Sequence, residues 1–115
     1  MNKKEYLNEI LEFIPSASQT LSKNPSQFVR GVSPVTISRG EGVYLWDNEG
    51  EKYLDFILAL GPMIFGYANK RIAGKVKEQI YKGTIFSLPS DREVELAKLL
   101  RKVVPCAEMS RFLMN

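Results

Sequence analysis

Two closely spaced glycine-containing turn signals constrain the fold of this chain most, at residues 39–42 (RGEG) and 47–50 (DNEG). Glycine and asparagine accept the positive φ that tight turns need. The signals separate three short runs rich in β-branched and aromatic residues, at 35–37, 43–47 and 52–57. The sequence therefore predicts a three-stranded antiparallel meander. Strands this short need a helix or a second sheet to cover their apolar face. We expect Tyr44 and Trp46 to pack on that face, and a binding role for these two side chains is the alternative.

Helices are predicted on both sides of this meander. Leu7, Ile10, Leu11 and Ile14 recur at helical spacing, and Pro15 ends that segment. Residues 16–33 are rich in Ser, Asn, Gln and Pro, and are interpreted as a connecting segment or plain linker.

The second half of the chain predicts two helices and a terminal strand. Ile72, Val76 and Ile80 line one side of a helix that Gly83 can end. Ser90 and Glu93 have the spacing of a capping box, which precedes an apolar stripe that stops at Pro105. Residues 111–114 have the character of a strand, whose partners in a parallel sheet would have to come from outside this chain. An α+β fragment is the expected fold.

Composition excludes several classes of function. The 16 basic and 13 acidic residues give a net charge of +3 and are spread along the chain, so nucleic-acid binding is not expected. No run of about 18 apolar residues occurs, so neither a membrane span nor a signal peptide is predicted. The chain has one cysteine, Cys106, and no histidine. We therefore expect neither an internal disulfide nor a metal site, and we expect a cytoplasmic location.

No catalytic constellation can be assigned from the residues. The carboxylates around the second turn are interpreted as surface charge: Asp47, Glu49, Glu51 and Asp55. Gly40 and Gly42 lie between two strands, whereas a phosphate-binding loop joins a strand to a helix. Cys106 has no histidine to activate it and is interpreted as structural.

Four spaced segments do, however, carry a resemblance to a known family. They are residues 39–56 (RGEGVYLWDNEGEKYLDF), 61–70 (GPMIFGYANK), 82–90 (KGTIFSLPS) and 104–112 (VPCAEMSRF). These segments resemble the N-terminal region of class III (fold type I) pyridoxal-phosphate aminotransferases, in particular the glutamate-1-semialdehyde 2,1-aminomutase branch. The resemblance implies a homodimeric enzyme that transfers an amino group between a small-molecule donor and acceptor.

The same resemblance implies a division of the chain. Residues 1–34 would form the N-terminal helix and connecting segment, 35–68 the meander of the small domain, and 69–115 the helices and first strand leading into the cofactor domain. In that family the phosphate-binding loop and the Schiff-base lysine lie further along. We therefore expect about the N-terminal quarter of such an enzyme, inactive and unable to bind pyridoxal phosphate alone.

Departures from the aminomutase pattern bear on the substrate. Gln27 aligns where the aminomutase has a carboxylate-binding arginine. Glutamine cannot form a charge-assisted bidentate pair with a carboxylate, so such a pair would require Arg30 to substitute for that arginine. The resemblance implies a different acceptor: an aldehyde, keto acid or keto-sugar. It gives as substrate-pocket candidates Gln27, Phe28, Arg30, Leu60 and Gly61, and as subunit-interface candidates Ile85 and Phe86. Ordinary packing is the alternative for each, and the alternative for the chain is a remnant or interaction module that pairs with a separate C-terminal polypeptide.

Overall fold

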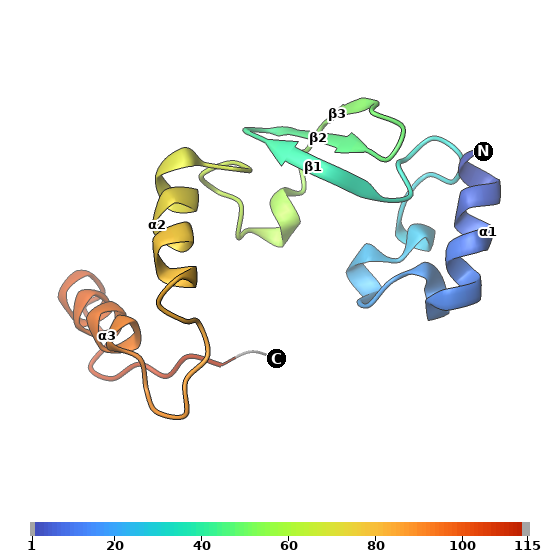
Figure 1. Cartoon of the computed structure of the whole chain (residues 1–115). Coiled ribbons are helices and arrows are strands. Elements are labelled where there is room, and N and C mark those ends of the chain that lie inside the picture. The colour runs from blue at the N-terminus through green and yellow to red at the C-terminus, as the bar shows by residue number, and fades with distance from the viewer. Residues whose placement is uncertain (1, 114–115) are drawn as a thin grey trace. The chain divides into compact units, whose positions relative to one another are not determined.

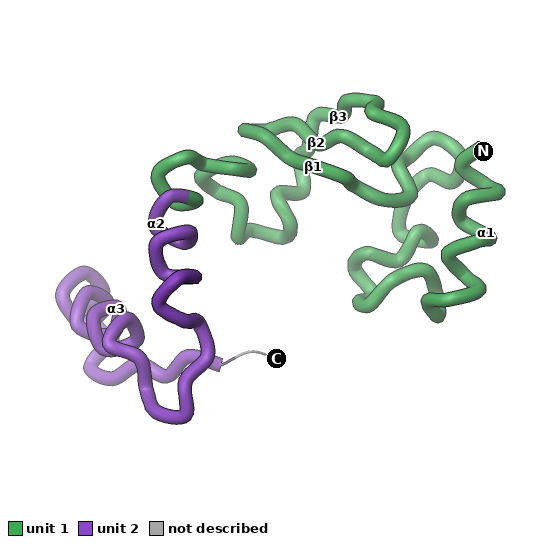
Figure 2. The backbone as a smooth tube through the Cα atoms, viewed as in Figure 1, with its two compact units in different colours: residues 1–73 green, residues 74–115 purple. Residues whose placement is uncertain are grey.

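The computed structural model describes residues 2–113, and this range contains three α-helices and a three-stranded antiparallel sheet. Figure 1 shows α1 first, then β1, β2 and β3, then α2 and α3, with short 3-10 turns between them. The chain divides into two units, residues 1–73 and 74–115, and the boundary falls inside α2 (Figure 2). The predicted α+β content with an antiparallel meander is confirmed.

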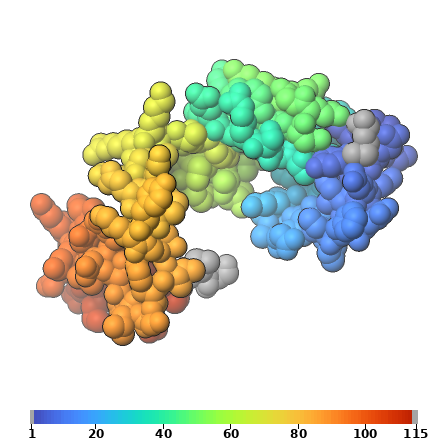
Figure 3. All heavy atoms as spheres, in the orientation of Figure 1, coloured from blue at the N-terminus to red at the C-terminus, as the bar shows by residue number. Residues whose placement is uncertain are grey.

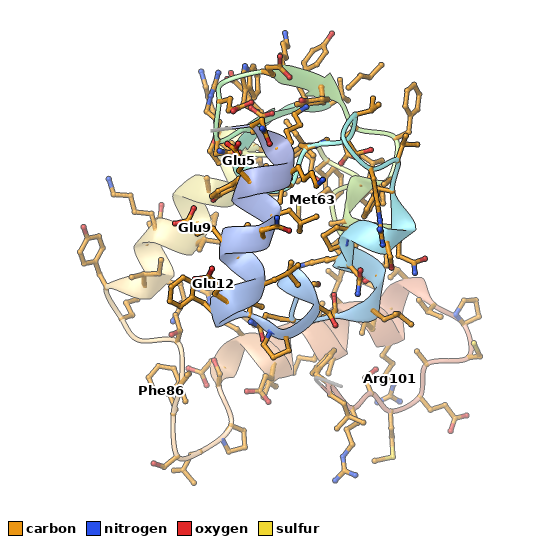
Figure 4. The ribbon with its side chains drawn as sticks, turned by 90° about the vertical axis from the view of Figure 1, so that its right-hand side faces the viewer. Glu5, Glu9, Glu12, Met63, Phe86 and Arg101 are labelled. Carbon is orange, nitrogen blue, oxygen red and sulfur yellow. The ribbon has the colours of Figure 1, made fainter. Side chains whose placement is uncertain are left out.

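Helix α1 spans Lys3–Phe13 and is fixed at both ends by local chemistry. The Asn2 side chain accepts a hydrogen bond from the Glu5 N–H at 2.9 Å, and the Glu5 carboxylate accepts one from the Asn2 N–H at 3.0 Å. This capping box satisfies two N–H groups that a helix start otherwise leaves unpaired. Ile14 ends the helix because Pro15 cannot continue it, as predicted. Figure 4 shows the acidic side of α1, formed by Glu5, Glu9 and Glu12.

The connecting segment after α1 is a series of ordered turns. Three short 3-10 helices follow one another: η1 (Pro15–Ala17), η2 (Leu21–Lys23) and η3 (Pro25–Gln27). The Asn24 side chain accepts from the Ser26 N–H at 2.8 Å and so caps η3. Serine, asparagine and proline thus shape local turns in this segment.

The sheet consists of β1 (Ile37–Glu41), β2 (Tyr44–Asp47) and β3 (Lys52–Leu54). The first predicted turn was too long, because Arg39 and Gly40 pair with Trp46 and Leu45 inside the sheet. The connection is only Gly42–Val43, and Gly42 has a φ of +58°, which a two-residue hairpin with glycine in its first position needs.

Both ends of the sheet are set by side-chain hydrogen bonds to the backbone. The β1–β2 register shifts between Ile37 and Arg39, and there the Ser38 hydroxyl lies 2.7 Å from the Asp47 carbonyl oxygen. The third strand was predicted to reach residue 57 but ends at Leu54. It ends there because the Asp55 carboxylate accepts backbone N–H groups two and three residues ahead and turns the chain.

Two helices dominate the second half of the chain. α2 (Lys70–Ile80) was predicted from its apolar spacing, and Gly83 follows it with a φ of +102°. α3 (Asp91–Val103) begins with the predicted capping box: the Ser90 hydroxyl accepts from the Arg92 N–H at 3.2 Å, and Glu93 accepts from the Ser90 N–H at 3.0 Å. The capping box and both helices are confirmed.

The predicted terminal strand is not formed within residues 111–113, and Met114 lies outside the described residues. A strand exists only when a neighbouring strand supplies hydrogen-bond partners. The sheet that the structure describes consists of β1, β2 and β3, and does not include this segment.

Among residues 2–113 no apolar side chain is buried. Phe56 of the first unit is 86% exposed, and Met109 and Ile85 of the second are 94% and 93% exposed, so each unit presents apolar side chains at its surface. Figure 3 draws the heavy atoms of the chain. Burial of apolar surface is the main force that stabilises a folded domain. Within each unit, however, the elements leave their apolar faces uncovered. Within this range no helix has the length and apolar character needed to cross a membrane.

Candidate functional site

A polar cluster joins the start of α1 to the β2–β3 turn, and Asp47 is its centre. One Asp47 carboxylate oxygen accepts from the N–H groups of Glu49 and Glu51 at 3.0 and 2.9 Å. The other lies 2.9 Å from the Tyr53 hydroxyl, which also lies 2.7 Å from the Glu51 carboxylate. Lys3 completes the cluster, since its ammonium donates to the Tyr53 hydroxyl at 2.9 Å.

The charge state of Asp47 follows from these contacts. Burial by itself would raise the pKa of Asp47, but the hydrogen bonds from the Tyr53 hydroxyl and from the Glu51 and Glu49 backbones outweigh it and lower the pKa. Lys3 has a raised pKa because its ammonium is hydrogen-bonded to Tyr53 and Glu51. The cluster is therefore an ion pair network that fixes the turn.

The interpretation of these carboxylates as surface charge was wrong for Asp47, which is only 2% exposed. The cost of burying a carboxylate is offset when its oxygens accept hydrogen bonds, and the Asp47 carboxylate has three donors. Glu49 and Glu51 are exposed, as that interpretation expects.

A second cluster lies where the chain leaves β3, and Asp55 is its centre. The half-buried Asp55 carboxylate accepts from the N–H groups of Ile57 and Leu58 at 2.8 and 3.1 Å, and from the Tyr67 hydroxyl at 2.6 Å. Burial, and then the hydrogen bond to Asp55, raise the pKa of Tyr67 to about 12. Tyr67 also pairs with Gly42 through two backbone hydrogen bonds of 2.8 and 2.9 Å.

The segment held by Asp55 has an unusual backbone. Leu58, Ala59 and Leu60 have φ values of +50°, +52° and +65°, and form the single left-handed turn η4 (Leu58–Leu60) before Gly61 at +117°. For a residue with a Cβ atom this conformation costs about 1–2 kcal/mol. Three such residues in succession therefore require outside support, and the Asp55 carboxylate supplies it at the N–H of Leu58.

The five substrate-pocket candidates lie on two segments of the first unit. Gln27, Phe28 and Arg30 lie in and just after η3, while Leu60 and Gly61 lie at the end of the left-handed turn. Within the first group, hydrogen bonds run from the Gln27 and Phe28 N–H groups back to residues 24 and 25. Leu60 is 72% exposed, so its side chain is available for a further contact.

The interface candidates Ile85 and Phe86 lie on the connection between α2 and α3, where Figure 4 labels Phe86. Phe86 contributes to a cavity of about 410 Å³ within the second unit. The remaining lining residues are mostly polar or charged: Gln79, Lys82, Pro89, Ser90, Asp91, Arg92 and Glu95.

Several polar groups of this cavity are already paired with one another. Arg92 is paired with Glu95 at 2.7 Å and the Ser90 N–H donates to Glu93, while Lys82 also lines the cavity. Asp91 adds a further negative charge on the cavity wall. Residues 2–113 also contain no group of three side chains suited to hold a metal ion.

The predicted packing aromatics form a cationic surface with their strand neighbours. The Arg39 guanidinium lies 3.6 Å from the Trp46 ring centroid, and the Lys52 ammonium lies 3.7 Å from that of Tyr44. Such contacts contribute about 0.5–1 kcal/mol each at exposed sites. Tyr44 and Trp46 thus pack against cations of adjacent strands, which the apolar pattern did not indicate.

Sequence reasoning missed the two tyrosines that organise these clusters. Tyr53 lies six residues after Asp47, whereas Tyr67 lies twelve residues after Asp55. The placement of Asp47 and Tyr53 on either side of one turn was the available signal for a contact between them.

Comparison with known proteins relates this geometry to one family. Residues 27–115 match the family described as Aminotransferase class-III. The glutamate-1-semialdehyde 2,1-aminomutase of Methanothrix thermoacetophila is 38% identical over 108 residues, which are 92% of this chain and 25% of that protein. The chain spans 18–25% of the length of such curated relatives.

Solved structures show the same relationship. The omega-transaminase of Sphaerobacter thermophilus superposes with a TM-score of 0.76 and 26% identity, over 90% of this chain and 22% of that one. The FumI protein of Sphingopyxis, solved with its PLP internal aldimine, shares the fold with a TM-score of 0.79 at 23% identity, over 90% of this chain and 25% of that one. Because the family match covers most of the chain and the fold agrees, this chain belongs to the class-III aminotransferase family.

Proposed function

We propose that this chain is the N-terminal portion of a pyridoxal-phosphate-dependent aminotransferase or aminomutase of fold type I, and that the chain alone is inactive. The observation that carries this proposal is the absence of any buried apolar side chain among residues 2–113. A domain of this size normally buries more than half of its unfolded surface. A segment that is separated from the rest of a larger fold exposes apolar faces on every helix.

The extent of the similarity supports the same proposal. The chain covers no more than a quarter of the aminomutases and transaminases it matches. In the proposed enzyme, residues 1–34 and 35–68 contribute the N-terminal helix and small-domain sheet, and residues 69–115 lead into the cofactor domain. The missing part would hold pyridoxal phosphate, which supplies the electron sink for amino-group transfer.

The proposed substrates are a small-molecule amino donor and an acceptor other than glutamate-1-semialdehyde. Gln27 replaces the arginine that would pair with a carboxylate, and it is exposed on η3 beside Phe28. A neutral amide favours an acceptor that is not held by a carboxylate at this position, such as an aldehyde or keto-sugar. Arg30 is the alternative partner for a substrate carboxylate. Leu60 and Gly61 would form part of the pocket wall. In a homodimer, Ile85 and Phe86 would contact the second subunit.

The exposed apolar surface also favours a second candidate, a remnant or interaction module that pairs with a separate C-terminal polypeptide. Met109 and Ile85 are almost fully exposed, so either a covalent continuation or a separate chain could cover them. The coding sequence after Asn115 distinguishes the two candidates. A continuous reading frame into a phosphate-binding loop supports the enzyme, and a separate downstream frame supports the paired polypeptides.

The test of the main proposal is cofactor binding with and without the missing part. The purified chain is mixed with pyridoxal phosphate, treated with borohydride and weighed by mass spectrometry. We expect no stoichiometric attachment to a lysine. The chain is then produced together with the C-terminal portion of the Methanothrix relative, and we expect a stable complex that binds the cofactor.

Two outcomes would contradict the proposal. Stoichiometric, reducible attachment to one lysine of the chain alone would show that the chemistry does not need the missing part. Failure of the two portions to form a complex, while the intact relative folds under the same conditions, would show that this chain does not complete such a fold.

A further inference from the structure

The left-handed turn at residues 58–61 is held from outside by a single side chain. The Asp55 carboxylate accepts the Ile57 N–H on one oxygen and the Leu58 N–H on the other. Within the turn, the Leu60 N–H donates to Ile57 and the Gly61 N–H donates to Leu58, each at 3.0 Å. The carboxylate therefore pairs the two N–H groups at the entry to the turn.

Asp55 is in turn anchored to the sheet through Tyr67. The Tyr67 hydroxyl donates to the oxygen that also receives the Leu58 N–H. The Tyr67 ring lies so close to Gly40 that a Cβ atom there would be 2.7 Å from the ring. Two backbone hydrogen bonds with Gly42 fix the same residue. Tyr67 thus links the turn to β1. An aspartate that served only its own local turn would need no such link.

We propose that Asp55 is a positioning residue that holds the left-handed turn so that Leu60 and Gly61 are presented to a substrate. Leu60 is exposed and follows two residues with positive φ, so its direction depends on that conformation. A right-handed or extended backbone would turn the same side chain elsewhere. The effect on substrate binding rests on the proposed function, whereas the effect on the turn does not.

The first test measures hydrogen exchange in the full chain at the Ile57 and Leu58 amides. Asp55→Ala should accelerate their exchange by about tenfold or more, as loss of a charge-assisted hydrogen bond implies. Asp55→Asn should give an intermediate value, because its amide has one acceptor oxygen in place of two. Asp91→Ala is the matched control, because Asp91 lies in α3 and should leave these amides unchanged.

A rescue variant separates the proposed role from general loss of structure. Adding Ala59→Gly to Asp55→Ala should restore slow exchange at the Leu60 and Gly61 amides, because glycine adopts positive φ without steric cost. Equal exchange in the wild-type chain and Asp55→Ala would overturn the proposal. Failure of the glycine rescue would also overturn it, since the turn would then not depend on backbone strain.

The second test uses the chain joined to its C-terminal portion. There Asp55→Ala should raise the KM for the amino acceptor by about tenfold and change kcat less, because the altered group acts in binding. An inactive wild-type complex would refute the proposed function, and the exchange data would still decide the role of Asp55. A fall in kcat with unchanged KM would overturn the positioning role.

Discussion

Replacing Gly40 by alanine tests whether the Tyr67 ring ties the loop of residues 55–67 to the sheet. A Cβ atom at Gly40 would lie 2.7 Å from Tyr67 Cγ, 2.9 Å from its Cβ and 3.0 Å from Leu45 Cδ2. Ordinary contact begins at 3.4 Å, so the ring has to withdraw. The nearest atoms are at the base of the Tyr67 side chain, and rotation of the ring cannot relieve the clash. The backbone pairing of Tyr67 with Gly42 must shift with it.

The expected cost is that of overpacking a fitted contact, about 1–3 kcal/mol. Hydrogen exchange at the Gly42 and Tyr67 amides measures this cost locally, which suits a chain whose residues 2–113 bury no apolar side chain. A loss of that size accelerates exchange by about 5- to 150-fold. Gly74→Ala is the matched control, since nothing lies within 4 Å of its added Cβ and it lies in α2. There alanine should stabilise the helix by up to about 1 kcal/mol.

Unchanged exchange at both amides in Gly40→Ala would refute the argument. It would mean that Tyr67 does not rest on β1, and that its contact with Asp55 is set by the loop alone. Equal acceleration in Gly74→Ala would show that the effect is unrelated to the close approach.

Three further predictions concern single contacts. Tyr67 has a pKa raised from 10.0 to about 12, so its stabilising bond to Asp55 should be complete below pH 10 and lost as pH rises through about 12; in an ultraviolet titration Tyr67→Phe should remove a late component, while that of Tyr53, whose pKa is also raised, should remain. The lowered pKa of Asp47 predicts the reverse dependence: its contribution is complete above the ordinary value of 3.8 and is lost as pH falls through the lowered pKa, and Asp47→Asn should abolish this acid transition in amide exchange. Ser90→Ala should destabilise the start of α3 by about 1 kcal/mol, seen as faster exchange at the Arg92 amide and not at α1.

Much of the secondary structure was predictable because it depends on contacts between near neighbours. Pro15 ends α1, and the Ser90 and Glu93 pair starts α3, through interactions that span three or four residues. The turn glycines and the runs of β-branched and aromatic residues predicted the meander for the same reason. The family resemblance was also available from the sequence, because several motifs occur in one order.

The lengths of the strands and the polar clusters depended on the tertiary structure. Arg39 belongs to β1 because it pairs with Trp46, and β3 stops early because Asp55 bends the chain. Lys3 meets Tyr53, which is bonded to Asp47, although Lys3 and Tyr53 are separated by 50 positions in sequence. No pattern of near neighbours encodes such a meeting.

The sequence by itself therefore determined the order of helices and strands and the family to which they belong. Only the tertiary structure decided which carboxylates are buried and that residues 58–60 adopt a left-handed turn. The physical reason is the range of the forces involved. Caps, turns and helix periodicity act over a few residues, whereas Lys3 meets Tyr53, and Tyr67 meets Asp55, only when the folded chain brings them together.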